Sequence, residues 1–153
     1  MKKLARILLA EDNANDLELT IAALDSFNLA NEITAVRDGA EALDYLYRRG
    51  ASANRPEGNP AAILLDIKMP KVNGLEVLEK IKSDPQLKTI PVVMLSSSRE
   101  EPDLQKAYSL GANCYVVKPV DYQQFFEAVK QIGVFWALLN EAPPGSLKRN
   151  CKT

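Results

Sequence analysis

The sequence predicts an α/β fold in which one doubly wound parallel sheet of five strands carries helices on both faces. Strand-like apolar runs and helix-like patterns alternate five times along the 153 residues, which is typical of a parallel sheet. The run at residues 62–66 is almost continuously apolar and rich in branched side chains, which indicates a strand buried on both faces. Polar residues follow several of these runs at the carboxyl ends of the strands, where open α/β sheets bind their ligands.

The overall composition narrows the class of protein. A net charge of −1 and a pI near 5.6 give no basic surface for nucleic acid. No apolar stretch reaches the ~20 residues that span a bilayer, and the first residues lack a signal-peptide pattern. The two cysteines, Cys114 in a predicted buried strand and Cys151 in the tail, do not make a disulfide framework. We therefore expect a single-domain cytoplasmic protein that binds neither nucleic acid nor membranes.

The chain contains no histidine. This excludes a histidine-containing catalytic triad, a histidine metal site and a histidine phosphocarrier within this polypeptide. Any phosphohistidine chemistry must therefore use a histidine of a partner protein.

The first half of the chain is expected to form two strand–helix pairs, with strands at Ile7–Ala10 and Ile33–Val36. Residues 13–16 offer capping side chains for the first helix, and a second helix follows Asp38 and Gly39. Apolar residues recur at helical spacing in the first helix, at Leu17, Ile21 and Leu24. The inner face of the second helix is expected to carry Ala42, Leu43, Leu46 and Tyr47. Residues 50–60 are rich in Gly, Pro and Asn and form a connecting loop.

The second half adds three strands, expected at residues 62–66, 90–96 and 114–117. The third helix carries Leu75, Leu78 and Ile81 and ends near Pro85. Pro102 suits the first turn of the fourth helix, and Gly111 follows its last turn. Asp121 and Gln124 resemble a capping box at the start of the final helix.

Charged side chains follow three of the predicted strands. Glu11 and Asp12 follow the first strand, Asp66 ends the third, and Lys118 follows the fifth. Because the carboxyl ends of parallel strands share one edge of the sheet, three acids and one lysine are expected to meet there. This set indicates a site for a divalent cation and a phosphoryl group.

These motifs, taken in order, resemble the receiver domain of two-component response regulators. The matching segments are Leu-Ala-Glu-Asp-Asn at 9–13, Leu-Leu-Asp-Ile-Lys-Met-Pro at 64–70, Asn-Gly-Leu at 73–75, Pro-Val-Val-Met-Leu-Ser-Ser at 91–97 and Gly-Ala-Asn-Cys-Tyr-Val-Val-Lys-Pro at 111–119. The resemblance covers residues 4 to 130. It implies a flavodoxin-like sheet of strand order 2-1-3-4-5, a receiver at residues 1–140 with an extended C-terminal helix, and a flexible tail at 141–153.

The resemblance also implies roles for the acids. Asp66 is the expected phosphoacceptor, and the protein is expected to signal without being an enzyme in its own right. Asp12 and Asp66 are the expected Mg²⁺ ligands, with Glu11 acting through water and the backbone carbonyl of Lys68 as a further ligand. Mn²⁺ and Ca²⁺ are expected substitutes for Mg²⁺. Lys68 departs from common receivers and leaves the lifetime of the phosphoryl group open.

Four residues near the last two strands complete the implied site. Lys118 is expected to pair with a phosphoryl oxygen, and the bond between Lys118 and Pro119 is expected to be cis. Ser96 matches the hydroxyl residue that turns toward the phosphoryl group, and Tyr115 matches the aromatic switch that packs inward afterwards. Ser97, adjacent to Ser96, stands where a small alanine is frequent.

A narrower resemblance points to the regulators that partner phytochrome histidine kinases. It rests on the loop at 48–60, the turn at 83–88, the segment 117–121 and Phe-Trp at 135–136. A sensor histidine kinase of phytochrome type is therefore the expected partner, and output is expected through protein contact or phosphoryl relay. The last helix lacks a polar face near its end, so we expect a homodimer built by Phe125, Val129, Ile132, Phe135, Trp136 and Leu139.

Three other functions fit parts of the sequence. A haloacid-dehalogenase phosphatase also uses a strand-end aspartate, but it needs a second acid where this chain has Lys68. An FMN-binding flavodoxin needs a phosphate-cradling loop after the first strand, where Glu11 and Asp12 would repel phosphate. A degenerate receiver that is not phosphorylated would not need the acids and Lys118, which are intact here.

Overall fold

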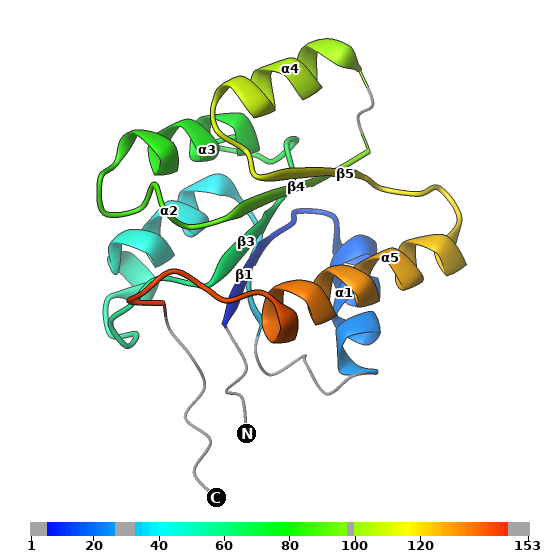
Figure 1. Ribbon diagram of the computed structural model, residues 1–153, viewed down its shortest axis with the longest axis horizontal. Coiled ribbons are helices and arrows are strands. Elements are labelled where there is room, and N and C mark those ends of the chain that lie inside the picture. The colour runs from blue at the N-terminus through cyan, green and yellow to red at the C-terminus, as the bar shows by residue number, and fades with distance from the viewer. Residues whose placement is uncertain (1–5, 27–32, 98–99, 147–153) are drawn as a thin grey trace, which may run out of the picture.

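The computed structural model describes residues 6–26, 33–97 and 100–146. It contains a parallel sheet of five strands in the order β2-β1-β3-β4-β5, which confirms the predicted order (Figure 1). The strands are β1 (Ile7–Ala10), β2 (Ile33–Val36), β3 (Ala62–Leu65), β4 (Val92–Ser96) and β5 (Cys114–Val117). The helices are α1 (Ala14–Asp25), α2 (Gly39–Tyr47), α3 (Gly74–Ser83), α4 (Glu101–Ser109) and α5 (Tyr122–Val134).

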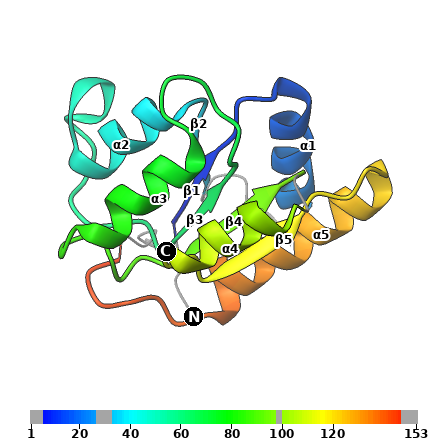
Figure 2. The same ribbon diagram turned by 90° about the horizontal axis from the view of Figure 1, so that it is seen from above.

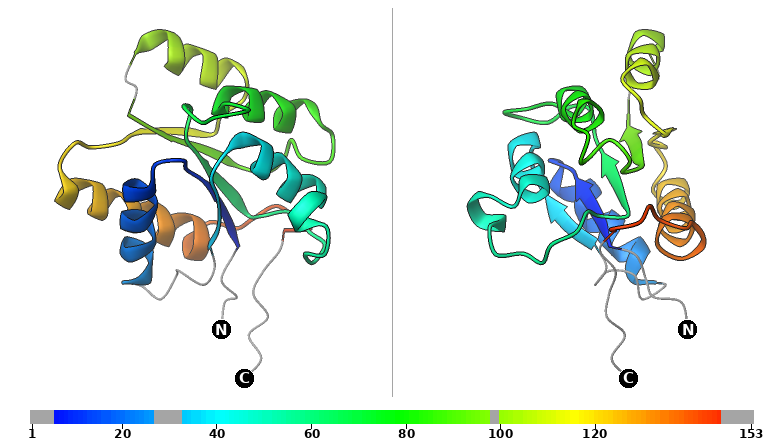
Figure 3. Two further views of the ribbon diagram at one scale, coloured as in Figure 1. Left: turned by 180° about the vertical axis from the view of Figure 1, so that it is seen from behind. Right: turned by 60° about the vertical axis from the view of Figure 1, so that its left-hand side comes forward.

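The sheet separates two layers of helices, as Figures 2 and 3 show from further directions. Helices α2, α3 and α4 pack on one face, and α1 and α5 pack on the other. Each face has its own apolar core, so the central strands are covered on both sides. This arrangement explains why β1, β3 and β4 are buried throughout.

The two edge strands are more exposed than the central ones. β5 was expected to be buried, but each of its residues is only half-buried, Cys114 included. An apolar run cannot reveal whether a strand has a neighbour on each side, because that depends on the strand order. β5 lies at one edge of the sheet and β2 at the other.

Side chains cap four of the helices, and two of these caps, on α1 and α5, lie where capping was predicted. In each case a side-chain oxygen of the residue before the helix accepts a hydrogen bond from a backbone N–H in the first turn. The capping residues are Asn13, Asp38, Asn73 and Asp121. For the predicted capping box, the structure confirms the contact in which the Gln124 backbone N–H donates to Asp121 Oδ1, at 3.0 Å.

Two apolar residues at helical spacing face solvent, and one of them, Tyr47, was predicted on the inner face of its helix. Ile21 on α1 is 37% exposed, and Tyr47 on α2 is 40% exposed. Tyr45 is buried in place of Tyr47 and lies under the guanidinium of Arg55. Helical spacing shows which residues share the apolar side of a helix. The rotation of the helix against the sheet then decides which of those residues are buried.

The C-terminal helix extends beyond α5 as a π-helical turn at Phe135–Leu139. Phe125, Val129 and Ile132 are buried in this chain's own core, so the prediction that they form a dimer interface was wrong. These residues recur at near-heptad spacing because they form the face of α5 that packs on the sheet. Of the other three residues, Trp136 packs partly against the same core, whereas Phe135 and Leu139 are 47% and 66% exposed.

The segment after this turn returns toward the loop between α2 and β3. The backbone N–H of Asn59 donates to the carbonyl oxygen of Gly145 at 3.3 Å, and Asn59 forms a bridge with Ser146. The predicted flexible tail thus includes residues that contact the loop, while residues 147–153 lie outside the described residues. Within the described part of the chain, no helix has the length and apolar character that crossing a membrane requires.

Candidate functional site

Backbone hydrogen bonds continue past the strand ends and hold the predicted site residues side by side. The N–H of Glu11 donates to the Val36 carbonyl at 3.0 Å, and the N–H of Asp66 donates to the Ala10 carbonyl at 3.1 Å. On the other half of the sheet, the N–H of Lys118 donates to the Ser96 carbonyl at 2.8 Å. The residues that follow β1, β3 and β5 are therefore fixed at one edge.

Gly74 lets the start of α3 approach this edge closely. Its N–H donates to the Ile67 carbonyl at 2.7 Å, and a methyl group at this position would overlap the Asp66 carbonyl oxygen. The glycine of the Asn-Gly-Leu motif is therefore needed because the backbone that carries Asp66 leaves no room for a Cβ atom.

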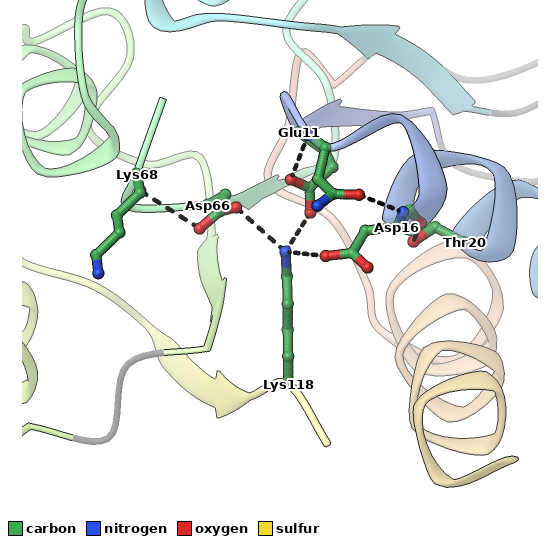
Figure 4. Close-up of polar contacts among 7 residues, drawn as sticks. Glu11, Asp16, Thr20, Asp66, Lys68 and Lys118 are labelled. Atoms are coloured by element: carbon green, nitrogen blue, oxygen red, sulfur yellow. Dashed lines mark hydrogen bonds and ion pairs between the residues drawn. The ribbon is translucent and has the colours of Figure 1, made fainter. Parts of the chain in front are cut away.

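The side chain of Lys118 spans the end of β4 to reach the acids beyond it (Figure 4). Its Nζ donates hydrogen bonds to Glu11 Oε1, to Asp16 Oδ2 at 3.0 Å and to Asp66 Oδ2 at 3.1 Å. Glu11 is 2% exposed, Asp66 8% and Lys118 9%. The predicted meeting of Glu11, Asp66 and Lys118 is therefore present, and it is almost shielded from solvent.

The carboxylates of Glu11, Asp12 and Asp66 form a group whose ligand oxygens all lie within 4.8 Å of one another. Asp12 is exposed, so the group opens to solvent on one side. Divalent cations such as Mg²⁺ prefer oxygen ligands and retain several waters, so few carboxylates are needed. The donor set therefore fits the predicted cation.

The electrostatics of the site are unbalanced toward negative charge. Burial raises the pKa of Glu11 to about 7, with a further contribution from Asp66, while Lys118 opposes the rise. Burial also disfavours the charged form of Lys118, but its contacts with Glu11, Asp66 and Asp16 outweigh this and raise its pKa. One ammonium thus does not neutralise the surrounding carboxylates, and the site favours binding of an additional cation.

The remaining predicted residues lie around this centre. Ser96 is buried at the end of β4, and Tyr115 is half-buried on β5 beside the core under α4. The N–H of Lys68 donates to Asp66 Oδ1 at 3.4 Å, while its exposed side chain points away from the carboxylate (Figure 4). Ser97 is exposed.

The prediction of a cis bond before Pro119 was wrong for this structure. No peptide bond in the described residues is cis, so the bond between Lys118 and Pro119 is trans. The trans form is favoured by about 0.5–1 kcal/mol for bonds that precede proline. Lys118 reaches Asp66 with the bond in that form.

Sequence reasoning missed Asp16 as a member of the site. Residues 13–16 were considered only as helix caps, and Asn13 indeed fills that role. Asp16 lies in the first turn of α1, which begins beside the carboxyl edge, and its carboxylate contacts Lys118. The sequence signal for Asp16 was an acidic residue in the first turn of the helix after β1. Such residues are common there because they stabilise helix N-termini, so the signal was not specific.

Comparison with known proteins identifies the family. The family model for the response regulator receiver domain matches residues 7–130 of this chain. The chain belongs to the response regulator receiver family. Receivers are signalling domains, and the predicted resemblance is confirmed.

Similar receivers include regulators associated with phytochromes. The chain is 40% identical over 130 residues to response regulator Rcp1 of Synechocystis sp., covering 85% of this chain and 87% of Rcp1. The structure of the phosphorylated cyanobacterial phytochrome response regulator RcpA matches with a TM-score of 0.84 and 45% identity, covering 91% of this chain and 98% of RcpA. The bacteriophytochrome response regulator RtBRR matches with a TM-score of 0.72 and 61% identity, covering 94% and 86%.

A related structure bears on the cation. The Mn²⁺-bound form of Rcp1 matches with a TM-score of 0.84 and 38% identity, covering 91% of this chain and 99% of that one. A divalent metal is therefore compatible with this kind of receiver, in agreement with the carboxylate group of Glu11, Asp12 and Asp66.

Proposed function

We propose that this receiver accepts a phosphoryl group on Asp66, in a Mg²⁺-dependent reaction, from a histidine of a phytochrome-type sensor kinase. The observation that carries the proposal is the position of the Lys118 ammonium, 3.1 Å from Asp66 Oδ2 and beside the carboxylates of Glu11 and Asp12. The Lys118 ammonium, together with a cation held by the carboxylates, would favour a transfer that brings a negatively charged phosphoryl group to a carboxylate.

The chemistry assigns separate tasks to two side chains. A carboxylate oxygen of Asp66 attacks phosphorus, so a P–O bond forms as the P–N bond to the partner's imidazole breaks. The imidazole, protonated on its other nitrogen, leaves as the neutral ring with the electron pair. Lys118 donates a hydrogen bond to an oxygen of the arriving group. A divalent cation held by the carboxylates of Glu11, Asp12 and Asp66 would supply further positive charge to the transfer.

The signal then spreads along β4 and β5. Lys118 is joined through its backbone N–H to the Ser96 carbonyl, so a change in the partners of its ammonium acts next to the Ser96 hydroxyl. Met94 pairs with Tyr115 in the same two strands. We infer that Ser96 turns toward the phosphoryl group and that Tyr115 packs inward in response, which shifts the balance between two states of the α4–β5 surface.

Phosphorylation with acetyl phosphate tests the acceptor. The wild-type protein is expected to be labelled with Mg²⁺ and not with EDTA, and Asp66→Asn is expected to remain unlabelled. Asp38→Asn is a matched control, because Asp38 is also buried but caps α2 at Glu41. Intact-mass spectrometry measures the extent of labelling. Equal labelling of Asp66→Asn and wild type would refute the assignment.

The kinase class needs its own test. The names of RcpA and RtBRR connect those relatives with phytochromes, and this likeness supports a similar partner here. Phosphoryl transfer from a purified bacteriophytochrome kinase is expected to be faster than transfer from a sensor kinase of an unrelated class. Equal rates from both kinases would remove the phytochrome part of the proposal and leave the acceptor untouched.

Self-association through the end of α5 is a second part of the proposal. Phe135 and Leu139 remain exposed beside a shallow surface pocket of about 380 Å³. Its lining residues are Glu127, Lys130, Gln131, Val134, Phe135 and Leu139. Burying the exposed part of these two side chains in each copy would stabilise a homodimer, at roughly 25 cal/mol for each Å² of apolar surface removed from water.

Sedimentation at micromolar concentration tests the homodimer. Leu139→Asp is expected to yield a folded monomer, because Leu139 is exposed in the single chain. Trp136 is less suitable, since it also packs against the protein's own core. Tyr108→Asp, an equal change at an exposed position on α4, is expected to leave the dimer intact. A monomeric wild-type protein, phosphorylated or not, would rule out the homodimer.

A further inference from the structure

The ammonium of Lys118 is saturated by charged partners in the described part of the chain. An ammonium has three N–H donors, and here they face carboxylate oxygens of Glu11, Asp16 and Asp66. The three partners are not equivalent. The side chains of Glu11 and Asp66 are 3% and 11% exposed, whereas that of Asp16 is 32% exposed.

Two of these partners are also candidate cation ligands. Glu11 and Asp66 belong to the group of clustered carboxylate oxygens completed by Asp12, and Asp16 does not belong to it among the described residues. The lysine therefore occupies carboxylates that a divalent cation needs. Two positive groups that share the same oxygens repel each other, and this repulsion is strong where solvent is excluded.

The position of Asp16 is fixed by its own helix. Its backbone N–H donates to Asn13 Oδ1 at 3.0 Å, and its carbonyl oxygen accepts from Thr20 Oγ1 at 2.6 Å. Thr20 is buried, so this second contact anchors the first turn of α1 to the interior. The carboxylate is thus held beside Lys118 by a turn that is itself secured on both sides (Figure 4).

We propose that Asp16 is a positioning residue, which retains the Lys118 ammonium at the edge of the site while Glu11 and Asp66 turn their oxygens to a divalent cation. This inference rests on the proposed cation-dependent function. Asp16 gives the lysine a partner outside the group of cation ligands, so cation binding does not expel the lysine. Lys118 therefore stays within reach of Asp66, where an arriving phosphoryl group needs it.

Titration calorimetry with Mg²⁺ tests the role of Asp16. Asp16→Asn removes the charge with little change in shape, and it is expected to weaken Mg²⁺ binding about three- to tenfold. Glu18→Gln removes the same charge from an exposed position on α1 and is expected to change the affinity less than about twofold. Asp16→Glu restores a carboxylate and is expected to recover part of the loss.

A double-mutant cycle separates positioning from simple attraction between Asp16 and the cation. In a Lys118→Met background, Asp16→Asn is expected to change Mg²⁺ affinity by less than about twofold, because the group it positions is gone. An equal loss in both backgrounds would overturn the inference, since Asp16 would then act on the cation directly. So would an Asp16→Asn variant that binds Mg²⁺ like Glu18→Gln.

NMR of the lysine side chain provides a readout that does not depend on the stability of Lys118→Met. In wild type with saturating Mg²⁺, the two ε-proton signals of Lys118 are expected to remain separate, as for a fixed ammonium. In Asp16→Asn with Mg²⁺ they are expected to merge, and two separate signals there would overturn the inference. A wild-type protein without saturable Mg²⁺ binding would refute the proposed function together with this inference, whereas normal binding with no effect of Asp16 would refute the inference alone.

Discussion

Lys118 and Lys82 lie at opposite ends of the sheet and use their ammonium groups differently. Lys118 follows β5 at the carboxyl edge and contacts three carboxylates of the described residues. Lys82, in the last turn of α3, reaches the ends where β4 and β5 begin. Its Nζ donates to the carbonyl oxygens of Lys88 at 3.0 Å and Ile90 at 2.8 Å, and to Asn113 Oδ1 at 3.1 Å.

The partners shift the pKa values of the two lysines in opposite directions. Burial lowers the pKa of Lys82, whose acceptors in these contacts are neutral. Burial acts on Lys118 in the same sense, but the carboxylates of Glu11 and Asp66 reverse the effect and raise its pKa. The side chain is the same in both places, so the difference comes from the charge of the oxygens around it.

The ammonium of Lys82 holds elements of the fold together, whereas that of Lys118 lies in the proposed site. Neutral oxygens accept the hydrogen bonds of the Lys82 ammonium and connect α3 to the start of two strands. This arrangement needs no ligand to complete it. The carboxylates around Lys118 exceed its single positive charge, and one of them, Glu11, is held with a raised pKa. An excess of buried negative charge is costly without a ligand and favours one that brings positive charge.

Replacing Lys118 is expected to have the largest effect on stability. Lys118→Met leaves Glu11 and Asp66 without their counter-ion, and the free energy of unfolding without divalent cations is expected to fall by about 3 kcal/mol. Urea denaturation measures this, and Mg²⁺ is expected to restore part of the loss. Lys68→Met, an exposed neighbour of the site, is the control. An unchanged unfolding midpoint for Lys118→Met would contradict the charge balance described above.

Replacing Lys82 is expected to have an intermediate effect confined to the fold. Lys82→Met removes three hydrogen bonds to neutral oxygens and is expected to lower the free energy of unfolding by about 2 kcal/mol. Mg²⁺ affinity and phosphorylation are expected to stay within about twofold of wild type, because the site is at the other end of the sheet. Lys80→Met, exposed on the same helix, controls for loss of charge. A selective loss of Mg²⁺ binding in Lys82→Met would contradict the conclusion that Lys82 contributes to the fold and not to the cation site.

The pH dependence of stability is expected to reveal Glu11. Burial raises its pKa from 4.5 to about 7, so between these values the folded state holds a proton that the unfolded chain has released. Stability without divalent cations should therefore fall as pH rises through this window, by about 1 kcal/mol for each pH unit. The glutamine in Glu11→Gln does not titrate, so the stability of this variant should change less between pH 4.5 and pH 7. Urea denaturation at both ends of the window measures it, and a wild-type profile that matches Glu11→Gln would disprove the shift.

An exposed lysine is expected to show the smallest effect. Lys71 pairs with Asp38 at 3.4 Å, but its side chain is 69% exposed. Lys71→Gln is expected to change the free energy of unfolding by less than about 0.5 kcal/mol, because solvent and salt screen such pairs. Thermal unfolding at low and high salt measures the difference. A loss of unfolding free energy as large as that of Lys82→Met would show that solvent exposure does not determine how much each lysine contributes to stability.

Much of the fold could be predicted because its signals are local. The alternation of apolar runs gave each strand and helix, and Asn13 and Asp121 marked helix starts that the structure confirms. The proximity of Glu11, Asp66 and Lys118 could be predicted because the carboxyl ends of parallel strands lie at one edge of the sheet. Tyr47 was placed wrongly, since the rotation of a helix against the sheet depends on residues distant in the sequence.

The sequence by itself determined the fold class, the strands that carry the site and the acids and lysine at their ends, because these follow from short-range patterns and one rule of topology. Only the tertiary structure decided which partners each charge has. It brought Asp16 to Lys118 across 102 positions of the chain, and it covered Phe125, Val129 and Ile132 with the protein's own sheet. These outcomes depend on the order of strands and the packing angle of helices, which no local pattern contains.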